Sequence, residues 1–98
     1  MRIRWLLRAR RELRAQRQYI AQERPAVAAR IVQTVLATVE RLADYPYYGR
    51  AAPWDKSQRL RGLPVPRTPF VVVYEVDEAR DTIIILRVVH GAQRRGPE

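Results

Sequence analysis

The segment from Ile85 to Arg95, ILRVVHGAQRR, holds the residues of this chain that are best suited to acid–base or phosphate chemistry. His90 is the single histidine, and an imidazole titrates near neutral pH, so it could act as the general base that deprotonates a ribose 2′-hydroxyl. Arg87 and Arg94, like Arg95, can pair with a phosphate or a carboxylate through a two-pronged guanidinium. The segment therefore combines a candidate base with candidate anion ligands.

His90 also has a structural interpretation, in which it ends a strand and hydrogen-bonds a carbonyl group beside Gly91. Side chains of a regular strand alternate between its faces, so Arg87 and His90 point to opposite faces unless a bulge intervenes. That separation counts against a compact site made of both residues. We therefore expect the structural role for His90.

Arg59 and Arg61 form a second candidate site, because side chains two residues apart in a strand share a face. In a nuclease they could hold the scissile phosphate and stabilise its added negative charge. The alternative is a solvated basic face that contacts a partner protein. We assign no catalytic residue; the candidates, if the chain is a ribonuclease, are Arg59, Arg61, Arg87 and His90. The residues expected to bind a target or a partner are Arg59, Arg61, Arg87, Arg94 and Arg95.

The 98 residues carry a formal net charge of +9, and 18 of the 19 basic residues are arginine. So strong a positive charge favours nucleic acid or an acidic protein as the partner. The absence of cysteine and the single histidine leave no disulfide and no metal-ligand set, so we expect no metal and no cofactor. The longest apolar runs are too short to cross a membrane, and the basic start has no continuous apolar segment. We therefore expect a cytoplasmic protein without membrane contact.

The positions of apolar and chain-breaking residues predict one α+β domain over residues 1–98, with a short loose tail at about 92–98. Pro25 favours the start of a helix, and a link of only a few residues makes the two predicted helices antiparallel. The expected elements, in the order β-α-α-β-β-β, are a strand at 2–6, helices at 8–22 and 25–43, an ordered loop at 44–58, and strands at 59–63, 69–76 and 82–90. We expect the N-terminal strand and the antiparallel helix hairpin to pack on one face of a mainly antiparallel sheet.

The two long strands are apolar on both faces, whereas a sheet with one wet face alternates polar and apolar residues. In the last strand, regular alternation places Ile85 and Val89 on one face and Leu86 and Val88 on the other. The helix hairpin covers only one face, so we expect other groups, an external partner among them, to shield part of the second. The residues expected between hairpin and sheet are Leu13, Ile20, Val35, Leu42, Val72 and Leu86.

Aromatic residues gather in the predicted loop, as Tyr45, Tyr47, Tyr48 and Trp54. They could stack on RNA bases, but the segment YPYYGR is more typical of a plug at the bottom of a helix hairpin. We therefore expect these tyrosines to be packed, and Tyr19 to lie in the core of the hairpin.

Four segments, in order and at matching spacing, resemble the RelE/ParE superfamily of bacterial toxin–antitoxin toxins over almost the whole chain. The segments are ARRELRAQRQYIAQERPAVAARIV, LADYPYYGR, PFVVVYEV and IIILRVVHGAQRR. The resemblance implies a small basic toxin that is neutralised by a cognate acidic antitoxin encoded beside it. RelE-like members cut mRNA on the ribosome, and ParE-like members poison DNA gyrase.

The C-terminal segment bears on the choice between these two targets. RelE-like nucleases usually place an aromatic residue near the C-terminus, and relatives commonly resemble HGARRWP, but this chain has Gly96 where the tryptophan would stand. Some nucleases of the family have a histidine in the last strand, which keeps His90 open as a base. The resemblance, with this departure, favours a ParE-like inhibitor that binds gyrase and is not an enzyme. The alternative is a RelE-like, ribosome-dependent mRNA endoribonuclease.

Overall fold

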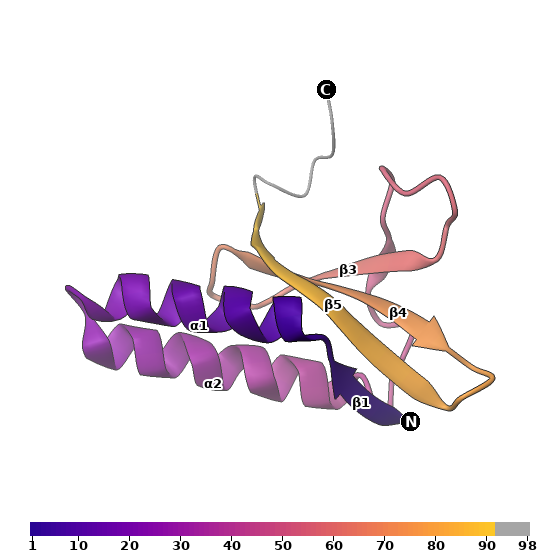
Figure 1. Cartoon of the computed structure of the whole chain (residues 1–98), viewed down its shortest axis with the longest axis horizontal. Coiled ribbons are helices and arrows are strands. Elements are labelled where there is room, and N and C mark those ends of the chain that lie inside the picture. Colours follow the sequence, from indigo (N-terminus) through magenta and orange to yellow (C-terminus); the bar gives the residue numbers. More distant parts are fainter. Residues whose placement is uncertain (92–98) are drawn as a thin grey trace.

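The computed structural model describes residues 1–91, so the predicted tail, with Arg94 and Arg95, lies outside the described residues. Within residues 1–91 the chain forms two helices and five strands (Figure 1). In chain order they are β1 (Arg2–Trp5), α1 (Leu7–Ala21), α2 (Pro25–Arg41), β2 (Arg50–Ala51), β3 (Leu60–Pro64), β4 (Phe70–Asp77) and β5 (Thr82–His90). Every predicted helix and strand is present, and β2 is an additional short strand inside the segment predicted as a loop.

The strands form one five-stranded sheet in the order β1-β5-β4-β3-β2. β1 runs parallel to β5, with Ile3 beside Ile83, and the other neighbouring strands are antiparallel. The parallel pair is possible because the helix hairpin and the rest of the sheet separate the two strands along the chain. The α+β class, the helix hairpin and the mainly antiparallel sheet are thereby confirmed.

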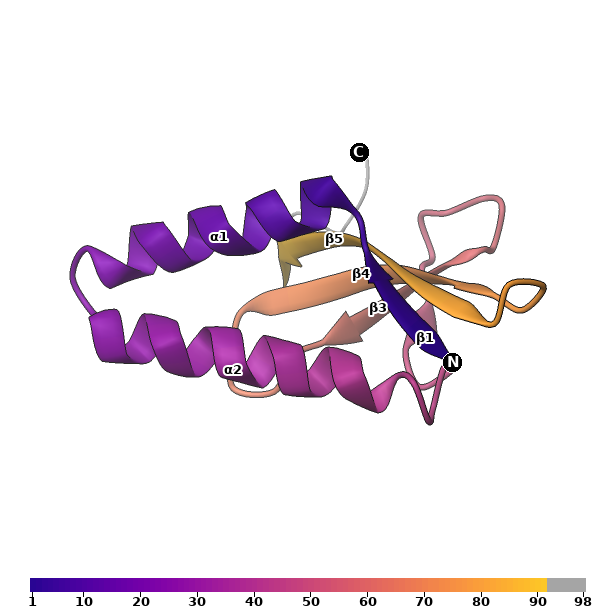
Figure 2. The ribbon, with the colours of Figure 1, turned by 60° about the horizontal axis from the view of Figure 1, so that its bottom comes forward.

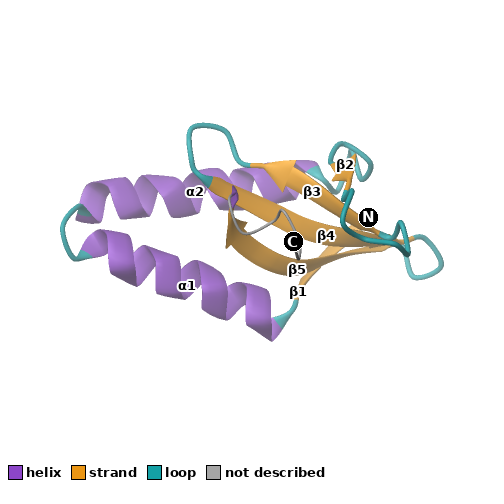
Figure 3. Cartoon of the chain, turned by 90° about the horizontal axis from the view of Figure 1, so that it is seen from above, coloured by secondary structure: helices purple, strands orange, loops and turns teal. Residues whose placement is uncertain are grey.

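The two helices lie side by side and cover one face of the sheet (Figures 2 and 3). α2 starts at Pro25, whose missing N–H is not needed in the first helical turn. Its buried side chains, Ala28, Val35 and Val39, recur at intervals of seven and four residues and so share one face of the helix. On α1, Tyr19 points away from the core and is 73% exposed, so its predicted place inside the hairpin is wrong.

The main core lies between the hairpin and the sheet. Its buried members are Ala9, Val35, Val39, Leu42, Leu63, Val65, Val72, Tyr74, Ile83 and Ile85. The prediction is confirmed for Val35, Leu42 and Val72, and Leu13 packs against this cluster while remaining partly exposed. Ile20 and Leu86 are only half-buried, so their predicted enclosure is wrong.

A β-bulge in β5 explains why Leu86 is not enclosed. Tyr74 of β4 pairs with Ile85, but Val73 pairs with Arg87, so Leu86 has no partner in β4. One extra residue on one strand interrupts the alternation of side chains between faces. The prediction assumed regular alternation and therefore placed Leu86 on the helix side together with Val88, whereas Ile83 and Ile85, before the bulge, are the residues that lie there with Val88.

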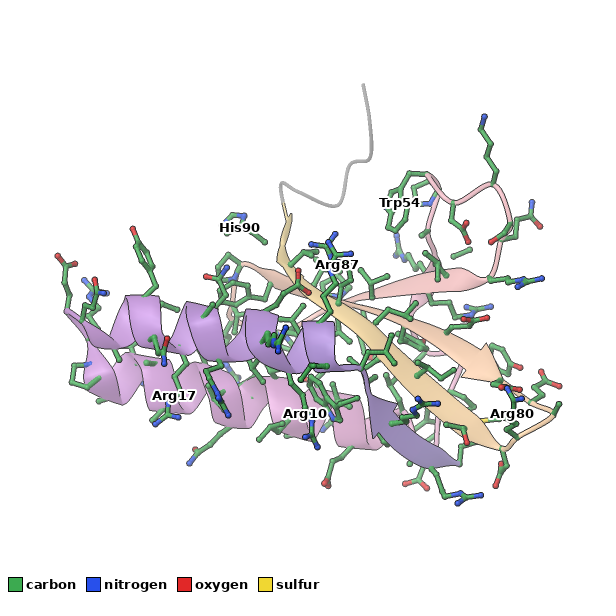
Figure 4. All side chains as sticks on the ribbon, viewed as in Figure 1. Arg10, Arg17, Trp54, Arg80, Arg87 and His90 are labelled. Atoms are coloured by element: carbon green, nitrogen blue, oxygen red, sulfur yellow. The ribbon has the colours of Figure 1, made fainter. Side chains whose placement is uncertain are left out.

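The second face of the sheet carries its own apolar cluster. Because of the bulge, Val88 pairs with Val72 on the helix side, while Val89 joins Val71 and Val73 on the far face. Two partly buried residues pack against this far-face cluster, Trp54 and Leu60. Trp54 belongs to the loop between β2 and β3 (Figure 4), so the chain itself shields part of the face for which an external partner was one candidate.

Candidate functional site

Glu12 of α1 joins the helix hairpin to β5. Its carboxylate accepts hydrogen bonds from Arg87 Nη2 at 2.6 Å, from Arg87 Nε at 3.1 Å, and from the backbone N–H of Val88 at 3.1 Å. β1 ends opposite Ile85, so within residues 1–91 the edge of β5 beyond that residue has no neighbouring strand. Glu12 satisfies a backbone donor that this open edge would otherwise leave without a protein partner. Arg8 adds a longer ion pair, at 3.9 Å.

This contact changes the interpretation of Arg87. Its guanidinium faces Glu12 across the edge of β5, and 39% of the side chain stays exposed. Binding of a target or partner by Arg87 is still a prediction, but it would use a side chain that is already oriented by α1. Glu12 was not among the site residues predicted from the sequence. The available signal was a lone carboxylate in a helix that carries five arginines.

His90 lies exposed at the end of β5 (Figure 4). Its ring meets the ring of Phe70 edge-on, with centroids 6.1 Å apart and an angle of 81° between the planes. His90 pairs with Phe70 and Arg87 pairs with Val73, so the two side chains leave opposite faces of β5. The bulge precedes Arg87 and does not intervene between it and His90.

Arg61 is turned into the loop between α2 and β2. Its Nη1 donates to the carbonyl oxygen of Gly49 at 2.7 Å, and its guanidinium carbon lies 4.8 Å from the centroid of the Tyr47 ring. Arg59 precedes β3, is exposed, and donates its backbone N–H to the Asp55 carboxylate at 2.9 Å. Arg59 therefore lies just outside the strand that holds Arg61, whereas the prediction placed both arginines in one strand.

Tyr74 anchors the same loop from inside the core. Its hydroxyl donates to the carbonyl oxygen of Pro46 and accepts from the N–H of Gly49, both at 2.8 Å. Burial raises the pKa of Tyr74 above its ordinary value of 10.0. A Cβ at Gly49 would lie 2.7 Å from both Cε1 and the hydroxyl oxygen of Tyr74, so only glycine fits at this position.

The anchor leaves the neighbouring tyrosines outside the core. Tyr45, Tyr47 and Tyr48 are 66%, 49% and 67% exposed, so the predicted plug of the helix hairpin is wrong. The physical reason is that the phenol of Tyr74 already occupies the space beneath the loop. Tyr47 contacts Arg61 and donates its hydroxyl to Glu78, a pair that closes the loop against the turn between β4 and β5.

Asp55 orders the loop between β2 and β3. Its carboxylate accepts from the N–H of Leu60 at 2.8 Å, the N–H of Arg59 at 2.9 Å and the hydroxyl of Ser57 at 2.7 Å. These donors, the Leu60 N–H foremost, hold the pKa of Asp55 below its ordinary value of 3.8. The ordered loop carries Trp54 to the far face of the sheet.

A cationic groove lies where α1, α2 and the end of β1 meet, with a volume of about 330 Å³. Its apolar lining is Trp5, Leu13, Val32 and Leu36, and its arginines are Arg10, Arg14 and Arg17. Figure 4 shows Arg10 and Arg17 reaching from α1 across α2. The three arginines are spaced by four and three residues, which places them on one side of the helix. That spacing is the signal by which the sequence could have revealed the groove.

Metal and membrane sites find no support in the described part of the chain. Within residues 1–91, no cluster of three or more potential metal ligands is present. In the same residues, no helix combines the length and the apolarity that crossing a bilayer requires.

Comparison with known proteins places this geometry in a class. The solved chromosomal ParDE toxin–antitoxin system from P. aeruginosa contains a chain of the same fold, with a TM-score of 0.77 and 25% identity over 92% of this chain and 95% of that chain. Protein Y4kP of Sinorhizobium fredii is 37% identical over 93 residues, 95% of this chain and 91% of that protein. Toxin RelE3 of Caulobacter vibrioides is 32% identical over 88 residues, 90% of this chain and 91% of that protein.

The fold and its arginine-rich surface thus define a small basic toxin of the RelE/ParE superfamily. The model of the ParE toxin of type II toxin–antitoxin systems, parDE, matches residues 3–95. The chain belongs to this family. It is the toxin component of a type II toxin–antitoxin system.

Proposed function

We propose that this toxin inhibits DNA gyrase by binding it and cleaves no RNA. The observation that carries the proposal is the dispersal of the four candidate catalytic side chains. Arg87 lies on the face of the sheet opposite Arg61 and His90. Arg61 and His90 share a face but are separated along it, because they pair with Tyr74 and Phe70, four residues apart in β4. A nuclease needs its base and its phosphate-binding groups within reach of one reacting centre. Membership of the ParE family supports the same target.

An mRNA endoribonuclease is the second candidate. It is favoured by the similarity to the protein named Toxin RelE3, and by the exposed imidazole of His90 at the end of β5. The Arg87 guanidinium is engaged by Glu12 on the other face, which argues against cooperation between the two residues.

His90→Gln separates the two candidates. If His90 were a general base, its loss would slow RNA cleavage by roughly 10²–10⁴-fold. We expect instead that the variant retains growth inhibition and inhibition of gyrase supercoiling, and that neither protein generates ribosome-dependent mRNA cuts in primer extension. Cuts that appear with the parent protein and vanish with His90→Gln would make the protein a nuclease.

Arg87→Ala combined with Arg94→Ala is the companion variant in the same assays, and we expect it to reduce growth inhibition without unfolding the domain. Glu12→Gln is its matched control, because it weakens the same ion pair but keeps both arginines. Retained inhibition by Glu12→Gln would assign the loss to the arginines and not to the broken contact.

The cognate antitoxin is proposed to be small and acidic and to dock an amphipathic segment in the cationic groove. Leu36 in the groove is 44% exposed, and the three arginines of α1 stand beside this apolar surface. Acidic residues of the segment would pair with the arginines while its apolar residues cover Leu13 and Leu36. The net charge of +9 would add long-range attraction.

Titration calorimetry with the product of the neighbouring gene tests this docking. We expect binding of about nanomolar affinity with a large negative heat-capacity change, since apolar surface is buried. Arg14→Glu should weaken binding about tenfold or more through charge repulsion. Arg24→Glu, in the turn between the helices, makes the same charge change outside the groove and should leave the affinity nearly unchanged. Equal losses in the two variants would show that only overall charge matters and would refute the groove as the docking site.

A further inference from the structure

Two exposed tyrosines and two arginines form a continuous surface at the end of α2 and along the loop that leads to β2. We call Arg41, Tyr45, Tyr48 and Arg50 the tyrosine–arginine surface. One hollow of this surface is lined by Arg41, Tyr45 and Tyr48, and a second, beside it, includes Arg41, Tyr48 and Arg50. The shared residues Arg41 and Tyr48 connect the two hollows.

The exposure of the two rings is imposed by a rigid framework. The N–H of Tyr45 donates to the carbonyl oxygen of Arg41 at 3.0 Å, and the N–H of Tyr48 donates to that of Tyr45 at 3.1 Å. Below them, the buried hydroxyl of Tyr74 holds the loop at two backbone groups. Aromatic side chains that are displayed on a fixed backbone lose little conformational freedom when they bind a ligand.

The charge of the surface is available for a ligand. Within residues 1–91, neither Arg41 nor Arg50 takes part in an ion pair. Among the described residues that line the two hollows, Arg41 and Arg50 are the charged side chains and none is acidic, so cationic groups predominate beside the rings. A ligand for this surface should therefore be anionic and should carry flat apolar faces.

The neighbouring sheet edge disfavours a peptide strand as that ligand. β2 pairs with β3 at Arg61 and Gly62, and no other strand of the described residues 1–91 lies along the edge of β3 beyond Gly62. Pro64 and Pro66 line the second hollow there and have no N–H, so a peptide would find few donors for strand addition. Stacking and phosphate contacts require no such donors.

We propose that the tyrosine–arginine surface binds single-stranded nucleic acid. Unpaired bases stack on Tyr45 and Tyr48, and the guanidiniums of Arg41 and Arg50 hold the flanking phosphates. The surface contains neither His90 nor Arg87, the residues whose substitution tests the alternative nuclease function. It also shares no residue with the groove proposed for the antitoxin. Binding here requires neither gyrase nor a ribosome.

Fluorescence anisotropy with labelled oligonucleotides of about 12 nucleotides tests the proposal, using oligo(dT), oligo(U) and a duplex of the same length. We expect the purified toxin to bind the single strands more tightly than the duplex. Tyr45→Ala combined with Tyr48→Ala should weaken single-strand binding about tenfold or more. Tyr19→Ala, which removes a ring that is 73% exposed on α1, is the matched control and should change the affinity little.

The arginines have a separate readout. Arg41→Gln and Arg50→Gln should each lower the salt dependence of single-strand binding by about 0.7 in the slope of log K against log salt. Arg24→Gln, elsewhere on the surface, should leave the slope unchanged. Circular dichroism and thermal melting should confirm that all variants are folded, because the substituted side chains are exposed and their replacement should change the stability little.

Two results would overturn the proposal. The first is a duplex affinity equal to the single-strand affinity, which would reduce the binding to general charge attraction. The second is unchanged single-strand binding by the folded double tyrosine variant. A preference between oligo(dT) and oligo(U) would identify which nucleic acid is the ligand. Because the assay contains no gyrase, ribosome or antitoxin, its failure leaves the proposed target of the toxin intact.

Discussion

Ile85→Ala is expected to lower the free energy of unfolding by about 2–5 kcal/mol, the range for removing most of a large aliphatic side chain from a closed core. Ile85 is 0% exposed and lies in the cluster between the hairpin and the sheet, beside Tyr74 across the strand pair. Truncation would leave a cavity between the helix hairpin and the sheet, and the many other contacts between these two layers prevent the site from collapsing easily.

Leu86→Ala is the matched control for this prediction. Leu86 is the next residue along β5 and has no partner in β4, because the bulge lies there, and its side chain is only half-buried. We expect a loss of about 1 kcal/mol, since truncation at a partly exposed site leaves no closed cavity. Urea unfolding followed by circular dichroism measures both values. Equal losses, or a larger loss for Leu86→Ala, would mean that the bulge is misplaced.

Gly49→Ala is expected to destabilise the protein by about 2–3 kcal/mol, through overpacking against Tyr74. The added Cβ would lie 2.7 Å from Cε1 and the hydroxyl oxygen of Tyr74 and 3.0 Å from the carbonyl oxygen of Gly62. Neither neighbour can move freely, because the Tyr74 hydroxyl is hydrogen-bonded on both sides and Gly62 belongs to the sheet. Gly91→Ala should cost less, because its Cβ would lie 3.2 Å from the carbonyl oxygen of Pro69, the nearest non-adjacent atom among the described residues.

The double variant Gly49→Ala with Tyr74→Phe provides an internal check by the same unfolding assay. Removing the hydroxyl relieves part of the clash, so the two losses should sum to more than the loss of the double variant. Strictly additive losses would show that the two residues do not meet.

The pH dependence of the free energy of unfolding should also reflect the burial of Tyr74. The pKa of Tyr74 is raised above 10.0 by burial, so the folded state favours the neutral phenol. The stability that this group contributes is fully present below the unfolded pKa and is lost as the pH rises through the folded pKa. Tyr74→Phe should therefore show a smaller loss of stability above about pH 10 than the parent protein. An identical alkaline loss in both proteins would mean that another group is responsible.

The order of helices and strands could be predicted from the sequence because it depends on neighbouring residues. Apolar residues at helical spacing, Pro25 at the start of α2 and short links between the last strands are local signals, and each predicted element formed. The same local signals supported the family resemblance that the comparisons then confirmed. The candidate site was harder to predict from the sequence, because its geometry depends on which faces of the helices and strands meet.

Tertiary structure alone decided three features. The bulge at Leu86 results from the pairing of β4 with β5, and it reverses the faces that regular alternation predicts. Glu12 reaches Arg87 across 75 positions of the chain because β1 ends early and leaves the edge of β5 open. Tyr74 fills the space beneath the loop after α2, so Tyr45 is exposed to solvent, although the segment YPYYGR predicted that it would be packed. Each outcome depends on contacts between residues far apart in the sequence, and no local sequence pattern specifies which distant residue will occupy a given site.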